Sequence, residues 1–80
     1  MSDVAPRVRR IVAAVLGVGE GAIDDQSSPD TVPAWDSMHH LQLVLAIEEE
    51  FGVQFDVEEI EAMQRVGAIV GLLQERVSPR

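Results

Sequence analysis

Residues 35–53 read WDSMHHLQLVLAIEEEFGV, and this stretch predicts an amphipathic helix over residues 37–51. Asp36 is a good N-cap, because its carboxylate can accept hydrogen bonds from the unpaired N–H groups of the first turn. Gly52 is a typical C-terminal stop. Ser37 then becomes the first helical residue, at a helix end that can hold a phosphate without any basic side chain. The same residues also fit a plain helix cap.

The apolar residues of this helix fall into two sectors when they are placed at 100° per residue. The first sector, which should face the core, consists of Leu43, Val44, Ile47 and Phe51. The second consists of Met38, Leu41 and Leu45, with Glu48 and Glu49 beside it. A core-facing stripe needs only one sector. The second sector is therefore either extra core or an exposed contact patch ringed by charge.

The remaining chain predicts three further helices. Apolar spacing indicates a helix over residues 3–16, ended by Gly17. The connection over residues 17–35 is long for a small domain, which is uncommon unless the loop is functional or pinned, and Ile23, Val32 and Trp35 are candidate pins onto the core.

Asp56 and Glu59 form a capping-box pattern that begins a short third helix. Residues 66–77 carry the last apolar stripe, although Gln64 and Arg65 are weak caps for its start. The expected fold is all-α: a small four-helix bundle of three main helices and a short third one, with a long loop between the first and second. We expect one domain over residues 1–80, with residues 1–2 and 78–80 frayed.

The charge distribution narrows the classes of partner. The chain of 80 residues has a net charge of −8 and no cysteine, and all six of its basic residues are arginines. Residues 20–61 hold 12 of the 14 acids and no Lys or Arg. This composition argues against nucleic acid as a partner, and it fits either a basic protein partner or plain solubility. Without a long apolar run or a signal-like start, we expect a monomeric cytoplasmic protein that does not bind membranes.

Asp36, Ser37, His39 and His40 could be taken for a hydrolase set. Neighbours on one helical turn point in different directions, whereas a nucleophile and its base must converge, so we predict no enzyme. Adjacent histidines also diverge, so we predict no metal site. We expect His39 to be solvated. His40 should lie near the core, as a hydrogen-bonded boundary residue or in contact with a tethered group.

Residues 35–53 closely resemble the core of acyl carrier proteins, whose pattern is Asp-Ser-Leu followed by a helix that ends near Glu-Glu-Phe-Gly. The helix order, the long loop and the short third helix also fit, so the resemblance covers nearly the whole chain. It implies that Ser37, next to the motif residue Asp36, carries phosphopantetheine from coenzyme A through a phosphodiester. The thiol of this arm would bear acyl groups as thioesters, so the chain would act as a cosubstrate and not as an enzyme.

The resemblance also implies the partners. They would be a phosphopantetheinyl transferase and acyl-loading and acyl-processing enzymes with basic docking surfaces. These partner enzymes would bind the second helix through Met38, Leu41, Leu45, Glu48 and Glu49.

Departures from the family pattern bear on the pathway. Met38 replaces the usual Leu, and His39 and Gln42 stand where many members have acids, so the front of the helix is less acidic than in fatty-acid members. This favours a stand-alone carrier of a dedicated pathway, polyketide-like or otherwise secondary. Peptidyl carriers usually show Gly-Gly before the Ser motif, whereas this chain has Pro33-Ala34. A stand-alone peptidyl or aminoacyl carrier remains the first alternative, and an acidic docking bundle that is never modified is the second.

Overall fold

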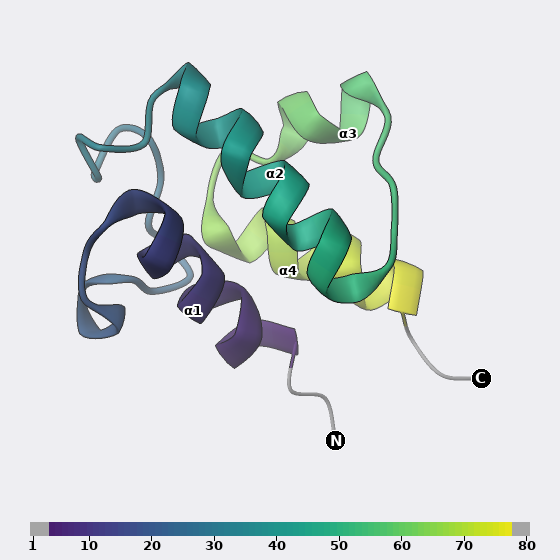
Figure 1. Ribbon diagram of the computed structural model, residues 1–80, viewed down its shortest axis with the longest axis horizontal. Coiled ribbons are helices and arrows are strands. Elements are labelled where there is room, and N and C mark those ends of the chain that lie inside the picture. Colours follow the sequence, from purple (N-terminus) through teal and green to yellow (C-terminus); the bar gives the residue numbers. More distant parts are fainter. Residues whose placement is uncertain (1–3, 78–80) are drawn as a thin grey trace.

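The computed structural model describes residues 4–77, so the fraying expected for residues 1–2 and 78–80 lies outside the described residues. Within that range the chain forms only helices: α1 (Val4–Leu16), a short 3-10 helix η1 (Glu20–Ala22), α2 (Ser37–Phe51), α3 (Val57–Ala62) and α4 (Val66–Val77) (Figure 1). The predicted all-α bundle is confirmed, including the short third helix and the long loop. The η1 turn inside that loop was not predicted.

The core lies where α1 packs against α2 and α4. Its fully buried side chains come from all three helices and from the link before α4: Val8, Val12, Leu43, Ile47, Met63, Val66, Ile69 and Leu73. The three predicted loop pins, Ile23, Val32 and Trp35, are also buried, so the long loop is fastened to the core. Burial of these apolar groups supplies the main stabilisation of so small a fold.

Two glycines end helices as predicted. Gly17 follows α1 with φ 72°, and Gly52 follows α2 with φ 66°, both in the left-handed region that glycine adopts without strain. In each case the next residue closes the helix: Val18 N–H donates to the Ala13 carbonyl at 3.0 Å, and Val53 N–H donates to the Glu48 carbonyl at 3.2 Å.

No side chain of α3 is fully buried, but Ile60 is partly buried against the core, and several polar contacts also hold this helix. The predicted capping box is present: Asp56 accepts from Glu59 N–H at 2.9 Å, and the Glu59 carboxylate accepts from Asp56 N–H at 3.1 Å. Arg76 of α4 donates to the Glu59 carboxylate and to the Gln54 carbonyl, and its guanidinium lies 5.3 Å from the Phe55 ring centroid. Thus α4 anchors the beginning of α3.

The start of α4, which lacks a local cap, is capped by the long loop. Val66 N–H donates to the Ser27 carbonyl at 3.0 Å, and Gly67 N–H donates to the Asp25 carbonyl at 2.9 Å. The loop turn is itself ordered by Ser27, whose buried hydroxyl accepts from Asp24 N–H at 2.9 Å. The loop therefore satisfies two N–H groups that a helix start leaves open.

The two glycines of α4 should respond differently to alanine. A Cβ on Gly71 would meet nothing within 4 Å, so Gly71→Ala should stabilise the protein by up to about 1 kcal/mol through helix propensity. A Cβ on Gly67 would lie 3.2 Å from the Asp25 carbonyl oxygen and would collide with the Arg65 guanidinium, so Gly67→Ala should show no such gain. Urea unfolding of both variants checks this prediction, and equal gains would contradict it.

Candidate functional site

Asp36 caps α2 as predicted. Its Oδ1 accepts from His39 N–H at 2.9 Å and from the His39 ring nitrogen Nδ1, which lies 2.8 Å away. The backbone bond first, and the ring bond next, hold the pKa of Asp36 below its ordinary value of 3.8, because both favour the ionised carboxylate. His39, expected to be solvated, is only partly exposed and is tied to the cap.

The cap should make the stability of α2 sensitive to acid. Because the folded pKa of Asp36 is lowered, its contribution is complete well above pH 3.8 and disappears as the pH falls through the lower, folded value. Asparagine caps about as well as aspartate but does not titrate. We therefore expect the stability advantage of the wild type over Asp36→Asn to shrink as the pH falls from neutral to below 3.8. Urea unfolding across this range measures it, and a pH-independent difference would contradict it.

Ser37 is the first residue of α2 and is exposed. Within residues 4–77 its hydroxyl has no hydrogen-bond partner, and neither do the backbone N–H groups of Ser37 and Met38. The other described serines differ: Ser27 is buried, and the Ser28 hydroxyl accepts from Asp30 N–H. Ser37 thus combines an accessible hydroxyl with two free donors at the positive end of a helix.

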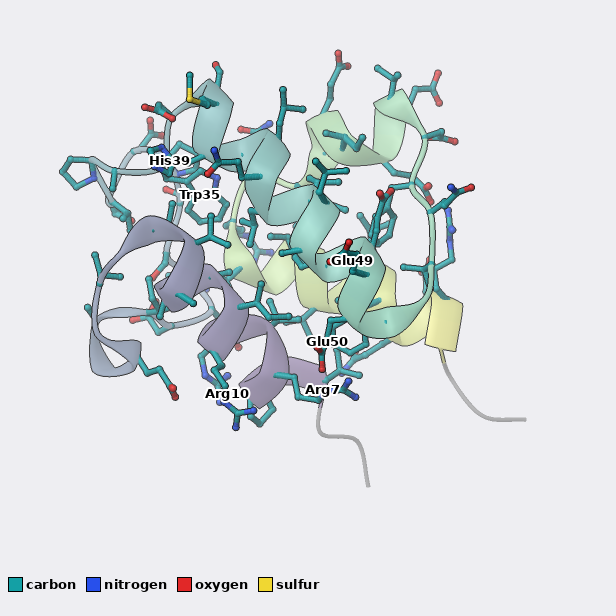
Figure 2. The ribbon with its side chains drawn as sticks, viewed as in Figure 1. Arg7, Arg10, Trp35, His39, Glu49 and Glu50 are labelled. Atoms are coloured by element: carbon teal, nitrogen blue, oxygen red, sulfur yellow. The ribbon has the colours of Figure 1, made fainter. Side chains whose placement is uncertain are left out.

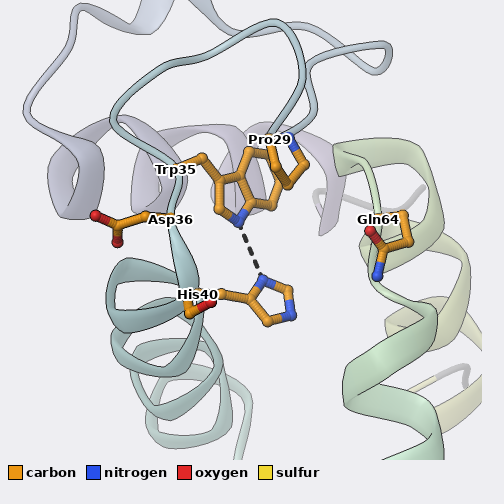
Figure 3. Close-up of a pocket in the computed structure, with 6 residues that line it drawn as sticks. Pro29, Trp35, Asp36, His40 and Gln64 are labelled. Atoms are coloured by element: carbon orange, nitrogen blue, oxygen red, sulfur yellow. Dashed lines mark hydrogen bonds between the residues drawn. The ribbon is translucent and has the colours of Figure 1, made fainter.

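A surface cleft of about 390 Å³ opens beside Ser37. Its lining comes from the long loop, the first turns of α2 and the link between α3 and α4: Pro29, Trp35, Asp36, Ser37, His40 and Gln64 (Figure 3). No Lys or Arg lines the cleft among the described residues, so the α2 backbone is its main source of positive potential.

His40 is the hydrogen-bonded boundary residue that the sequence predicted. Trp35 Nε1–H donates to His40 Nδ1 at 3.0 Å, and the two rings stack with centroids 6.1 Å apart (Figure 3). His40 Nε2 lies 3.0 Å from the Ile60 carbonyl oxygen. Because Nδ1 accepts, Nε2 must carry the proton and donate to Ile60. The side-chain bonds of His39 and His40 therefore go to Asp36, Trp35 and Ile60, and none goes to Ser37.

The second apolar sector of α2 is exposed, so it is not extra core, and its role as a contact patch stays a prediction. Met38, Leu41 and Leu45 expose 66%, 58% and 62% of their surface; we call these three residues the α2 patch. Glu49 is exposed and has no ion-pair partner in the described part of the chain. Glu48 has a role that sequence reasoning missed: it is half-buried, and its carboxylate accepts from Phe55 N–H at 2.8 Å.

The arginines neutralise part of the acidic middle of the chain. Within residues 4–77, four ion pairs join them to acids of that region: Arg7 to Glu50, Arg9 to Asp25, Arg10 to Glu20 and Arg76 to Glu59. Figure 2 shows Arg7 of α1 near Glu50, whereas the neighbouring Glu49 of α2 lies farther from Arg7. The unpaired acidic charge of residues 20–61 is therefore smaller than the sequence suggested, and Glu49 is an exposed acid of α2 that is still without an ion-pair partner among the described residues.

Comparison with protein families matches residues 6–73 of the chain to the model described as a phosphopantetheine attachment site. This range includes the whole of α2 and most of α1 and α4. The match confirms the resemblance that residues 35–53 indicated, and it sets aside the reading of the chain as a docking bundle that is never modified. No helix in residues 4–77 has the length and apolarity needed to cross a membrane. The chain belongs to the phosphopantetheine-attachment family, whose members are non-catalytic carriers that present a covalently bound phosphopantetheine group to partner enzymes.

Proposed function

We propose that this protein is an acyl carrier protein that holds acyl groups as thioesters on a phosphopantetheine arm attached to Ser37. The observation that carries the proposal is the exposed Ser37 hydroxyl beside two unpartnered N–H groups at the start of α2. When bound, the arm supplies the thiol that this cysteine-free chain lacks.

The residues around Ser37 suit a phosphodiester. The N–H groups of Ser37 and Met38 would hold its oxygens, and the α2 dipole would balance its charge where no basic side chain lines the cleft. Asp36 keeps the first turn in place through its bonds to His39. Attachment forms one bond between Ser37 Oγ and phosphorus and breaks one P–O bond of the coenzyme A pyrophosphate. Adenosine 3′,5′-bisphosphate leaves with the bridging oxygen, and the hydroxyl proton is released.

The test is incubation of the purified chain with coenzyme A and a broad-specificity phosphopantetheinyl transferase. We expect the intact mass to rise by one phosphopantetheine. Peptide mapping should place the added mass on the peptide that contains Ser37 and leave Ser27 and Ser28 unchanged. An added mass on a different serine, or none under conditions that modify a known carrier, would refute the assignment.

The nature of the cargo extends this proposal. The Pro33-Ala34 pair before the motif and the less acidic front of α2 favour an acyl carrier of a dedicated pathway over a peptidyl or aminoacyl carrier. We propose that it works as a monomer in the cytoplasm. Loading the thiol form with acyl and with aminoacyl donors separates these two classes. The intact mass of the protein isolated from its own host would show the natural cargo directly.

We further propose that enzymes with basic docking surfaces bind the α2 patch beside Ser37. A transferase that reaches Ser37 must cover the start of α2, and the exposed Met38, Leu41 and Leu45 continue along the same helix. An apolar centre with a charged rim is the common anatomy of such contacts. Glu49 would supply the steering charge, whereas Glu48 is engaged with Phe55 N–H.

Glu49→Lys should slow association with the transferase and weaken its dependence on salt, because charge at the rim acts mainly on encounter. Glu75→Lys is the matched control, since Glu75 is an exposed acid on α4 and the change in net charge is the same. Stopped-flow association at several salt concentrations measures both variants. Equal slowing by the two substitutions would show a net-charge effect and contradict a role for Glu49 in docking.

A further inference from the structure

One hydrogen-bond chain crosses three elements beside the proposed attachment site. It runs from the Trp35 indole, at the end of the long loop, through the His40 imidazole of α2 to the Ile60 carbonyl of α3. Figure 3 shows the first of these bonds at the cleft. Trp35 is 2% exposed, so its N–H depends on His40 for a partner.

The far end of α3 depends on the same residue. Arg76 and the capping box hold the beginning of this helix, which has no fully buried side chain and packs only the partly buried Ile60 against the core. At its other end, the Ile60 carbonyl receives the His40 side chain and the Met63 N–H. A short helix with so little buried surface belongs to the least stable part of a fold. Loss of the His40 contact should therefore loosen α3 before the rest of the bundle.

The hydrogen bonds from Trp35 through His40 to Ile60 can form together only when the His40 imidazole is neutral. A protonated imidazole has two N–H groups and no acceptor, so its Nδ1–H repels the indole N–H, and the ring must move away from Trp35 and carry Nε2–H away from Ile60. The buried indole N–H would then face another donor, which is costly. Imidazole is the side chain that normally changes charge between about pH 5 and 8.

The charges that face His40 are few. Asp36 is the charged side chain that shares the cleft lining, the positive end of α2 lies beside it, and on α3 the exposed Glu61 follows Ile60. In the described chain, no charged side chain of α1 or α4 lines the cleft. Any new charge on Ser37, which lines the same cleft, would therefore be a large change in the local field.

We propose that His40 is a proton-sensitive positioning residue that couples the charge at Ser37 to the seating of Trp35 and α3. Protonation of His40 releases the indole and loosens α3. The coupling to Ser37 rests on the attachment proposed above: the negative phosphodiester favours the imidazolium, so the modified protein loosens α3 at a higher pH than the unmodified one. Modification would thereby make the α3 side of the cleft easier to open.

The unmodified protein tests the first half of this proposal. Trp35 is the single Trp of a chain without Tyr, so both its fluorescence and its indole N–H resonance report on this site alone. We expect both signals, together with hydrogen exchange of the α3 amides, to change together, with one shared midpoint, as the pH is lowered. A pH titration without any change at Trp35 or α3 would overturn the proposal.

Two matched variants separate positioning from a general effect of acid. His40→Gln can offer a carbonyl oxygen to Trp35 and an N–H to Ile60 without gaining a proton, so it should keep the fold and lose the pH transition. His39→Gln removes the other histidine and should keep the transition. A transition that persists in His40→Gln, or that vanishes in His39→Gln, would contradict the role of His40.

The second half is tested by charge at position 37. The phosphopantetheinylated protein should show its midpoint about half a pH unit or more above that of the unmodified chain. Ser37→Asp places a carboxylate there without any modification and should shift the midpoint in the same direction. If the transferase leaves Ser37 unmodified, the proposed function fails, yet Ser37→Asp still decides the coupling. If the midpoint is unchanged in both the phosphopantetheinylated protein and Ser37→Asp, the coupling between position 37 and His40 is overturned.

Discussion

Ser37→Ala should accept no phosphopantetheine from coenzyme A, while the variant keeps the fold of the unmodified chain. The substitution removes the hydroxyl that would form the phosphodiester. Ser37 is exposed, and its side chain makes no hydrogen bond within residues 4–77, so stability should change by no more than about 0.5 kcal/mol. Intact mass measures the loss of modification, and urea unfolding measures the preserved fold.

The matched control for this variant is Ser28→Ala, in the long loop. The Ser28 hydroxyl accepts from Asp30 N–H at 3.2 Å, so its removal perturbs the loop locally but should leave modification intact. Continued modification of Ser37→Ala would refute Ser37 as the attachment residue. Loss of modification in both variants would point to the shape of the loop instead of the hydroxyl.

Helix α2 and its site could be predicted from sequence because the signals are local. Asp36 lies three residues before the N–H that it caps, and Gly52 ends the helix by its own backbone freedom. The capping box of α3 likewise involves residues three apart. Periodicity separated the buried Leu43 from the exposed Leu45, although it could not say whether the second sector was covered.

The features that sequence reasoning missed depend on contacts between distant segments. The start of α4 is capped by carbonyls of Asp25 and Ser27, some 40 residues earlier in the chain. Glu48 accepts from the backbone of Phe55 across the turn after α2, so it is not a free rim charge. The four ion pairs of the arginines likewise join residues from separate segments of the sequence. No pattern within one helix indicates which distant backbone group will meet it.

Leu43→Ala and Leu45→Ala should have opposite consequences although the two leucines lie two residues apart on α2. Both substitutions change the helix propensity equally, so a difference between them reports the surroundings. Leu43 is completely buried, and Leu43→Ala should cost roughly 2–5 kcal/mol of folding stability. Leu45 is 62% exposed, so Leu45→Ala should cost little stability.

For binding to the transferase, we expect the larger effect from Leu45→Ala and the smaller one from Leu43→Ala. If Leu45 is a central contact of the α2 patch, its truncation should cost about 1–2 kcal/mol of binding, or a 5- to 30-fold faster dissociation. The folded fraction of Leu43→Ala should dissociate at the wild-type rate, because Leu43 presents no surface to a partner. Unfolding and surface-plasmon measurements on the same preparations compare the two. Normal dissociation of Leu45→Ala would show that Leu45 is not part of the docking surface. A large loss of stability in Leu45→Ala would show that Leu45 belongs to the core.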